Sequence, residues 1–358
     1  MKLVAAVKLK PSREQAAALS ATLARCNEAC TWLAAIGFEN GTFRQFDLHK
    51  LAYTALRGRF GLTAQAAVRC VAKTADAFKI NRTKPPIFRR DAAQPYDDRI
   101  IRFTKDNAVS IWTVEGRLTI PVAMGDRQRA LMTYRKGEVD LCKVRGQWVL
   151  AATCDIPETD EFRADDWLGV DLGIVALAAD SDGVVHSGGD VERIRIKFSR
   201  RRAGLQRRGT KAAKRRLRKL SGRQSRFQKI TNHRIAKALV QTAERTGRGI
   251  ALEDLKHIRR RVTARHGQRA RLHNWAFGHL RACVAYKAKL AGVPVAYVDP
   301  RHTSIGCRVC GVIDKKSRPD QATFSCVACG HTEPADVHAA RNIRARATVT
   351  TPYVLAAA

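Results

Sequence analysis

The sequence predicts a multidomain α/β protein, in which a β-barrel domain carries an inserted helical bundle and a second domain alternates strands with helices. Apolar residues recur at helical spacing up to about residue 84, and at every second position between residues 87 and 156. From residue 165 onward, short apolar strands alternate with helical segments, which is typical of a sheet covered by helices. Two Cys-x-x-Cys pairs near the C-terminus predict a small metal-bound insertion in this second domain.

The first part of the chain has the pattern of one β-rich domain interrupted by helices. Residues 1–10 contain a strand, and Ser12 with Gln15 forms a capping box that begins a helix. Helical spacing then predicts a bundle over residues 11–84. Period-two strands follow over residues 85–160, which predicts a compact barrel or sandwich. We expect the first strand to join this sheet, so that the helical bundle is an insertion.

The second domain is predicted to contain three apolar strands and three acidic residues. Asp171 lies in the first strand, Glu253 ends the second, and Asp336 opens the last helix. A lone ionised Asp in an apolar strand is costly unless a cation or hydrogen bonds compensate it, although a turn Asp at a strand end is the simpler explanation of Asp171. Because strands that alternate with helices can gather such residues at one edge of a sheet, we expect the three acids to lie together.

Three gathered carboxylates would favour hard divalent cations. They repel one another and raise each other's pKa, and Mg²⁺ relieves this while keeping coordination positions for water and phosphate oxygens. Two such ions can activate a water molecule and stabilise the leaving oxygen of a phosphodiester. Asp171, Glu253 and Asp336 are therefore candidate catalytic residues and ligands of two Mg²⁺ ions, with Mn²⁺ as a substitute.

Four cysteines have the spacing of one structural zinc site. Cys307 and Cys310 are separated by fifteen residues from Cys326 and Cys329, and each pair is followed by Gly. This spacing suits one tetrahedral Zn²⁺, whereas the alternative, a set of disulfide-forming cysteines, would not need it. We expect the zinc ribbon to be an insertion over residues 303–333.

The other six cysteines are expected to pack as small apolar side chains in a reducing cytoplasm. Cys26 and Cys30 lie four residues apart on a predicted helix, which leaves a second metal site open there. The six are Cys26, Cys30, Cys70, Cys142, Cys154 and Cys283.

The charge of the chain indicates a polyanionic partner. The sequence holds 66 Lys and Arg against 32 Asp and Glu, a formal net charge of +34. Such an excess is typical of proteins that bind nucleic acid. Aromatic residues make up 6% of the chain, so contacts to phosphate should matter more than base stacking. No apolar run reaches the roughly 18 residues of a membrane helix, and the N-terminus is too weakly apolar for a signal peptide, so we expect no membrane partner.

The positive charge is concentrated in residues 193–243, which contain no acidic residue. A solvated charged surface is the usual explanation of such a run. Here the run is long and of one sign, which favours a helical hairpin that faces nucleic acid. The candidate nucleic-acid-binding residues are Arg200, Arg201, Arg202, Arg207, Arg208, Lys211, Lys214, Arg215, Arg216, Arg218, Lys219, Arg223, Arg226 and Lys229.

A His and Asn pair farther along the chain invites comparison with a His/Asn nuclease motif. His273, Asn274 and His279 lie in one predicted helical segment, without the β-hairpin that such a site needs. We expect them to be structural or to face RNA.

Several sequence motifs can be considered together. They are GVDLGI, NHRIAKALV, GIALEDL, WAFGHLRACVAYKAKLAGVPVAYVDPRHTS, the two CxxC pairs and ADVHAARNI. This set resembles the TnpB proteins, the OrfB-type products of insertion sequences. The similarity extends to KLKPSREQAAAL near the N-terminus and so covers nearly the whole chain, most specifically at the C-terminal motifs.

The resemblance implies an RNA-guided DNA endonuclease related to the type V CRISPR effectors. It implies a RuvC-type, RNase H-like nuclease domain over residues 161–302 and 334–358, with Asp171, Glu253 and Asp336 as its three acids. The implied partners are a guide RNA and a double-stranded DNA target, which is cleaved next to a short adjacent motif. We expect a monomer within a ribonucleoprotein, in the prokaryotic cytoplasm and at the nucleoid when bound to DNA.

The same resemblance assigns the remaining segments. Residues 1–10 and 85–160 correspond to a wedge domain, and residues 11–84 to a recognition domain. His338 stands where the family commonly has Asn, and its imidazole could tune the local pKa or contact a phosphate.

Three other functions fit part of the sequence. A miniature type V CRISPR effector would share fold and site and would differ in the RNA that it binds. An RNA-guided DNA-binding repressor would be expected to lack one of the three acids, and all three are present. A strand-transferring transposase could use three acids, but the full motif set disfavours it.

Overall fold

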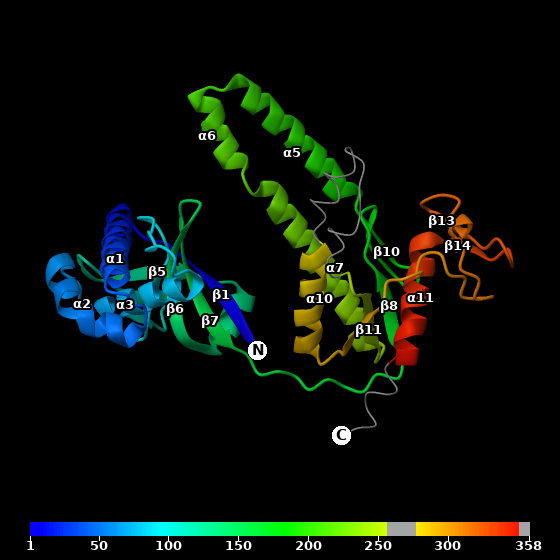
Figure 1. The fold of residues 1–358 in the computed structure, drawn as a ribbon, viewed down its shortest axis with the longest axis horizontal. Coiled ribbons are helices and arrows are strands. Elements are labelled where there is room, and N and C mark those ends of the chain that lie inside the picture. The colour runs from blue at the N-terminus through cyan, green and yellow to red at the C-terminus, as the bar shows by residue number, and fades with distance from the viewer. Residues whose placement is uncertain (256–276, 351–358) are drawn as a thin grey trace. The chain divides into compact units, whose positions relative to one another are not determined.

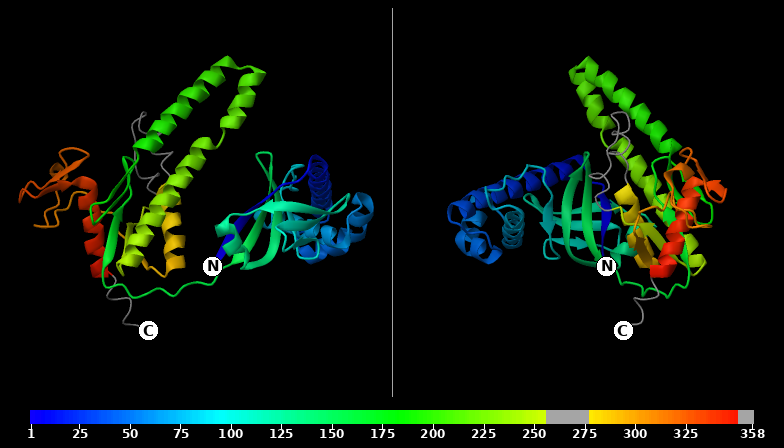
Figure 2. Two further views of the ribbon diagram at one scale, coloured as in Figure 1. Left: turned by 180° about the vertical axis from the view of Figure 1, so that it is seen from behind. Right: turned by 45° about the vertical axis from the view of Figure 1, so that its right-hand side comes forward.

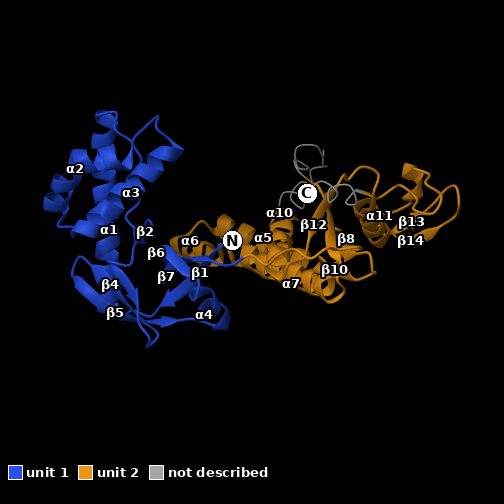
Figure 3. Cartoon of the chain, turned by 90° about the horizontal axis from the view of Figure 1, so that it is seen from below, with its two compact units in different colours: residues 1–157 blue, residues 158–358 orange. Residues whose placement is uncertain are grey.

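The computed structural model of the chain describes residues 1–255 and 277–350. The chain divides into two compact units, residues 1–157 and 158–358, which Figure 3 draws in different colours. The predictions for His273 and Asn274 lie outside the described residues.

The first unit is organised by one antiparallel sheet of seven strands among the described residues, in the order β2-β6-β7-β1-β5-β4-β3. The strands are β1 (Lys2–Leu9), β2 (Gln94–Tyr96), β3 (Ile101–Phe103), β4 (Ala108–Thr113), β5 (Gly116–Ala123), β6 (Arg135–Val144) and β7 (Gln147–Asp155). The sheet curls into a nearly closed barrel, in which its two edges approach each other. Tyr96, in the edge strand β2, donates a hydrogen bond to the carbonyl oxygen of Trp112 in β4, next to the opposite edge, at 3.1 Å. Strand β1 lies between β7 and β5, so the first strand joins this sheet as the sequence predicts.

Three helices follow β1 in the chain before the sheet resumes (Figure 1). They are α1 (Arg13–Glu39), α2 (Gln45–Phe60) and α3 (Ala64–Ile80), and a short helix α4 (Asp126–Met132) follows β5. The predicted capping box is confirmed: Ser12 Oγ accepts from the Gln15 N–H at 3.1 Å, and Gln15 Oε1 accepts from the Ser12 N–H at 3.0 Å.

The cysteines of this bundle are packing residues. Cys26, Cys30 and Cys70 are fully buried in the core between α1 and α3, and Cys30 donates its S–H to the Cys70 carbonyl oxygen at 3.6 Å. Among the described residues they do not form a group that could hold a metal ion, so the alternative of a second metal site at Cys26 and Cys30 is not supported.

The second unit is built on a five-stranded sheet in the order β10-β9-β8-β11-β12, counted over the described residues. The strands are β8 (Trp167–Asp171), β9 (Ala176–Asp180), β10 (Val185–Ser187), β11 (Gly249–Glu253) and β12 (Val295–Val298). Strands β8, β11 and β12 run parallel, and β9 and β10 are antiparallel to their neighbours.

Helices cover both faces of this sheet (Figure 1). Leu168 and Leu252 face a core shared with α7 (Arg223–Arg245) and α10 (Phe277–Ala291). The alternate residues Trp167 and Ala251 face the opposite side, where α11 (Ala335–Thr350) packs. This alternation is what a two-residue side-chain period requires of a sheet buried on both faces.

Gly169 lets α11 lie directly against β8. A Cβ atom at this position would stand 2.0 Å from the Ala340 carbonyl oxygen and 2.6 Å from the Arg344 backbone nitrogen. Both atoms belong to the helix backbone, which cannot move aside as a flexible side chain can. The absence of a side chain at Gly169 therefore sets the distance between the strand and the helix.

The basic segment forms a projecting hairpin of three helices, α5 (Gly189–Arg208), α6 (Lys211–Leu220) and α7. The views in Figures 1 and 2 show α5 as one arm and α6 with α7 as the other. Gly209 turns the chain between α5 and α6 with a φ of 65°, a conformation that favours glycine.

A small module with four cysteines connects β12 to α11. It contains the 3₁₀ helix η1 (Lys315–Ser317) and the two-stranded sheet of β13 (Thr323–Ser325) and β14 (Thr332–Pro334). Across residues 1–255 and 277–350, no helix combines the length and apolar character that crossing a membrane requires.

Replacing Gly169 by Ala should destabilise the protein by at least about 2 kcal/mol, because the added methyl group overlaps the α11 backbone. The matched control is Gly204→Ala in α5, where no atom lies within 4 Å of the new methyl group and a gain of about 0.5–1 kcal/mol is expected. Urea unfolding of the full chain measures both. Equal stability of the parent and Gly169→Ala would contradict the close approach.

Candidate functional site

Two of the predicted acids end neighbouring parallel strands. Val170 of β8 pairs with Leu252 of β11, so the next residues, Asp171 and Glu253, lie side by side at the carboxyl edge of the sheet. Asp336 is the second residue of α11, the helix that packs on β8. One sheet edge and one helix start thus bring together three residues that are far apart in the sequence.

The environment of these acids disfavours their ionised forms. Burial and the neighbouring charges of Glu253 and Asp336 raise the pKa of Asp171 to about 7. Burial also raises the pKa of Glu253, whose exposed fraction is 9%, and the pKa of Asp336. A cation bound here would compensate the charges, and carboxylate oxygens are the ligands that hard divalent cations prefer.

The three carboxylates line the edge without converging on one point. Among the described residues, they do not form a group whose ligand atoms all lie within 4.8 Å of one another. Such an arrangement suits ions that are each held by part of the set better than one ion held by all three acids.

Two neighbours of the acids were not predicted as part of the site. Thr303 is buried and donates its hydroxyl hydrogen to Glu253 Oε1 at 2.5 Å, which fixes that carboxylate. Arg318, from the four-cysteine module, lowers the pKa of both Asp171 and Asp336 by its positive charge. Thr303 follows β12 and Arg318 follows η1, and no local pattern in the sequence marks either residue for these roles.

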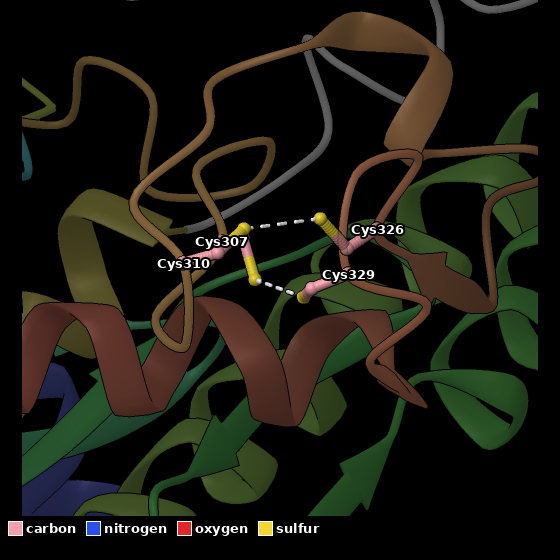
Figure 4. Close-up of side chains that lie close together, drawn as sticks. All are labelled: Cys307, Cys310, Cys326 and Cys329. Atoms are coloured by element: carbon pink, nitrogen blue, oxygen red, sulfur yellow. Dashed lines mark hydrogen bonds between the residues drawn. The ribbon is translucent and has the colours of Figure 1, made fainter.

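The four cysteine sulfurs point toward one another (Figure 4). The Sγ atoms of Cys307 and Cys329 are 3.7 Å apart, and those of Cys310 and Cys326 are 3.5 Å apart. These separations exceed a disulfide bond and fit the sulfur–sulfur distance of about 3.8 Å in a tetrahedral tetrathiolate metal site.

The backbone of the module shapes two matching turns. The Gly311 N–H donates to the Cys307 carbonyl oxygen at 2.9 Å, and the Gly330 N–H donates to the Cys326 carbonyl oxygen at 3.0 Å. Both glycines have positive φ angles, 77° and 70°. The N–H groups of Cys329 and Ala328 donate to the Cys326 sulfur and lower the pKa of that thiol to about 6, which favours the thiolate that a metal binds.

A buried carboxylate ties the module to α11. Burial raises the pKa of Glu333, but hydrogen bonds from His338, His331 and Arg308 outweigh it and lower the pKa to about 2. Arg341, one turn farther along α11, also donates to Glu333. The start of α11 is therefore held by charge-assisted hydrogen bonds to the module.

His338 is a structural residue of this connection. Its side chain is fully buried and stacks on Phe324 with ring centroids 3.5 Å apart. Nδ1 lies 2.6 Å from Glu333 Oε1, and Nε2 lies 2.8 Å from the Gly306 carbonyl oxygen. Because both nitrogens are engaged inside the protein, the imidazole is not available to a phosphate, and that interpretation of the sequence was wrong.

The predicted nucleic-acid-binding residues all lie on the projecting hairpin. The fourteen side chains are exposed on α5, α6 and α7. Near the tip, α5, α6 and the start of α7 line a cavity of about 420 Å³ with a basic and partly apolar wall, formed by Arg201, Gly204, Leu205, Arg208, Arg216, Lys219, Leu220 and Arg223. The hairpin presents one continuous positive surface of the kind that phosphate backbones bind.

Replacing Asp171 by Asn should stabilise the protein at pH 8 in the absence of divalent cations, by on the order of a few kcal/mol. The folded protein raises this pKa to about 7, so stability is lost as the pH rises through that value and Asp171 ionises. The advantage of Asn should shrink as the pH falls from 7 toward 4. Thermal unfolding of both proteins in EDTA across this range measures it, and equal stability at pH 8 would contradict the raised pKa.

Parts of the chain are similar in sequence to known proteins. Residues 277–343 match the Cas12f1-like TNB domain family. The chain is 34% identical over 217 residues to the CRISPR-associated endodeoxyribonuclease Cas12f1 of Sulfoacidibacillus thermotolerans, covering 56% of this chain and 50% of that protein. It is 34% identical over 157 residues to the TnpB-like protein MJ0751 of Methanocaldococcus jannaschii, covering 43% of this chain and 56% of that protein.

The fold is similar to that of a solved complex. The protein in the cryo-EM structure of the Cas12f1–sgRNA–target DNA complex superposes with a TM-score of 0.58 at 17% identity, over 91% of this chain and 81% of that chain. The chain spans about half the length of the curated relatives that it matches first. The chain is thus similar, over part of its length, to a TnpB-like protein and to a Cas12f1 protein, and its last part matches the Cas12f1-like TNB domain family.

Proposed function

We propose that the protein is an RNA-guided DNA endonuclease that cleaves double-stranded DNA next to a short adjacent motif. The observation that carries the proposal is the sheet edge, where Asp171 and Glu253 end parallel strands and Asp336 opens the helix packed beside them. The pKa values of all three are raised, mainly by burial, so the edge is suited to bind cations. The relationship to proteins named endodeoxyribonucleases supports DNA as the substrate.

The residues of this edge would hold two Mg²⁺ ions, or Mn²⁺ in their place. Bound there, the ions supply an activated water and stabilise the leaving oxygen of a phosphodiester. The Thr303 hydroxyl orients Glu253. At the end of its strand, Asp171 would have its negative charge compensated by a bound ion. Arg318 brings a positive charge toward the same edge, where a phosphate of the substrate strand would also lie.

The four cysteines would hold one structural Zn²⁺. Their spacing and the sulfur separations of 3.5 and 3.7 Å support this ion, for which four thiolates are a common ligand set. Folding of the module around zinc would fix Glu333, and through Glu333 and His338 the position at which α11 begins. The ion would thus act on the reaction only by placing Asp336.

The basic hairpin would bind the guide RNA and the DNA strands paired with it. Its fourteen exposed Lys and Arg side chains support contacts to phosphate, with sequence read by base pairing. We propose that the protein works as a monomer in a ribonucleoprotein in the prokaryotic cytoplasm. Both a Cas12f1 and a TnpB-like protein are relatives, and sequencing of the co-purified RNA distinguishes a CRISPR guide from a transposon-end guide.

Replacing Asp171 by Ala should reduce Mg²⁺-dependent cleavage at least about 1000-fold, because a metal ligand is lost, while guide-RNA-dependent DNA binding persists. A plasmid-cleavage assay and a gel-shift assay with the purified ribonucleoprotein measure the two quantities. The control is Glu244→Ala, which removes an exposed acid near the C-terminal end of α7 and should leave cleavage unchanged. Cleavage by Asp171→Ala at the parental rate would refute the assignment.

Replacing Cys307 and Cys310 together by Ser should remove one zinc ion per chain and lower the cleavage rate, because α11 loses its anchor. Elemental analysis and the same cleavage assay test this. Cys142→Ser, a half-buried cysteine of the first unit, is the control that should keep the zinc content. An unchanged zinc content of the double variant would show that these cysteines bind no zinc.

A further inference from the structure

A second group of metal-ligand side chains lies on the face of the sheet opposite α11. His233 comes from α7, and His279 and Cys283 come from successive turns of α10. Their candidate ligand atoms all lie within 4.8 Å of one another. Cys283 is buried, and the two imidazoles are half-buried beside it.

The distances within this group fit a tetrahedral ion. The Cys283 sulfur lies 3.5 Å from His233 Nδ1 and 3.6 Å from His279 Nδ1. With Zn–S near 2.3 Å and Zn–N near 2.0–2.1 Å, a tetrahedral angle requires a sulfur–nitrogen separation of about 3.5–3.6 Å. The sulfur also lies 4.0 Å from His233 Nε2 and 3.9 Å from His279 Nε2, so it lies beside each ring, and each imidazole would turn about its Cβ–Cγ bond to direct Nδ1 at the ion.

A fourth ligand position is also provided. The Tyr286 hydroxyl lies 3.2 Å from His233 Nδ1. The Asn232 amide N–H donates to His279 Nδ1 at 3.2 Å, a hydrogen bond that a bound ion would replace. Neighbouring nitrogen and oxygen ligands of one tetrahedral ion are about 3.3 Å apart. The Tyr286 oxygen, or a water beside it, can therefore complete the set.

The environment acts differently on the imidazole and on the thiol of this group. Burial and the nearby charge of Lys229 lower the pKa of His279, so its imidazole is neutral at pH 7. Burial raises the pKa of Cys283, and the charge of Lys287 opposes this effect. An arriving cation would displace the thiol proton of Cys283 to the solvent, as metal binding to a cysteine requires.

The other cluster with two histidines, around Glu333, is less suited to a metal ion. His331 and His338 share Glu333 with the guanidinium groups of Arg308 and Arg341, which already supply positive charge to that carboxylate.

We propose that His233, His279 and Cys283 form a second metal site for a thiophilic divalent cation such as Zn²⁺, with Tyr286 or water as the fourth ligand. The site joins α7 to α10 at the point where α7 passes from the exposed hairpin into the core. On its C-terminal side Ile235 and Leu239 pack into the core, and on its N-terminal side Lys229 is exposed on the basic hairpin. The ion clamps the root of the hairpin onto the nuclease core.

The zinc content of the purified full chain tests the proposal. Inductively coupled plasma mass spectrometry should find two zinc ions per chain in the parent and one in Cys283→Ala, a substitution that removes the thiol and keeps the side chain small and apolar. Cys154→Ala, another buried cysteine with no metal-ligand group among the described residues, is the matched control and should keep two. Cys307→Ser with Cys310→Ser should also retain one ion, held by the second site.

The result for the parent protein decides the question even if a variant folds poorly. One zinc per chain in the parent, with the same content in Cys283→Ala, would overturn the second site and leave the four-cysteine site intact. Two zinc ions in the parent that fall to one in His279→Gln as well as in Cys283→Ala would establish it, independently of whether the protein cleaves DNA.

Discussion

The contact between Gly169 and the backbone of α11 determines the geometry on which the rest of the second unit depends. Strand β8 carries Asp171 at its end, and α11 carries Asp336 at its start, so the separation of the two carboxylates follows from how closely strand and helix pack. The helix is held at its other contacts by the Glu333 network and by Arg344, which pairs with Asp166 before β8. Backbone packing, rather than the acids themselves, therefore assembles the candidate site.

Charge is distributed unevenly over this protein. The chain has a net charge of +34, yet it buries or half-buries three acids at one sheet edge. Arg318 is close enough to affect two of them. Negative groups held in a strongly positive protein attract small cations, while the exposed hairpin attracts polyanions. If the proposed function holds, cations and nucleic acid would therefore bind to separate surfaces of the same unit.

The sequence was informative where the pattern is local. The Ser12–Gln15 capping box could be predicted because its signal lies within four residues, and the first strand could be placed with the later strands because they share its period-two pattern. Thr303, Arg318 and the Glu333–His338 pair could not, since their roles depend on which segments pack together. His279 and Cys283 share a helical face in the sequence, but His233 joins them only when α7 packs on α10. These groups of residues are formed by tertiary contacts, which spacing along the sequence does not predict.

The position of β1 has a consequence for how the chain folds during synthesis. This strand is synthesised before the other strands of its sheet, but it lies in the middle of the sheet. Its residue Lys2 pairs with Asp155, near the end of the unit in sequence. Such pairing requires a long loop to close before its contacts can stabilise it, which slows folding. The helices α1 to α3 can pack on one another earlier, because their contacts are closer in sequence. On the ribosome, the helical bundle should therefore be structured while the barrel still waits for its last strand.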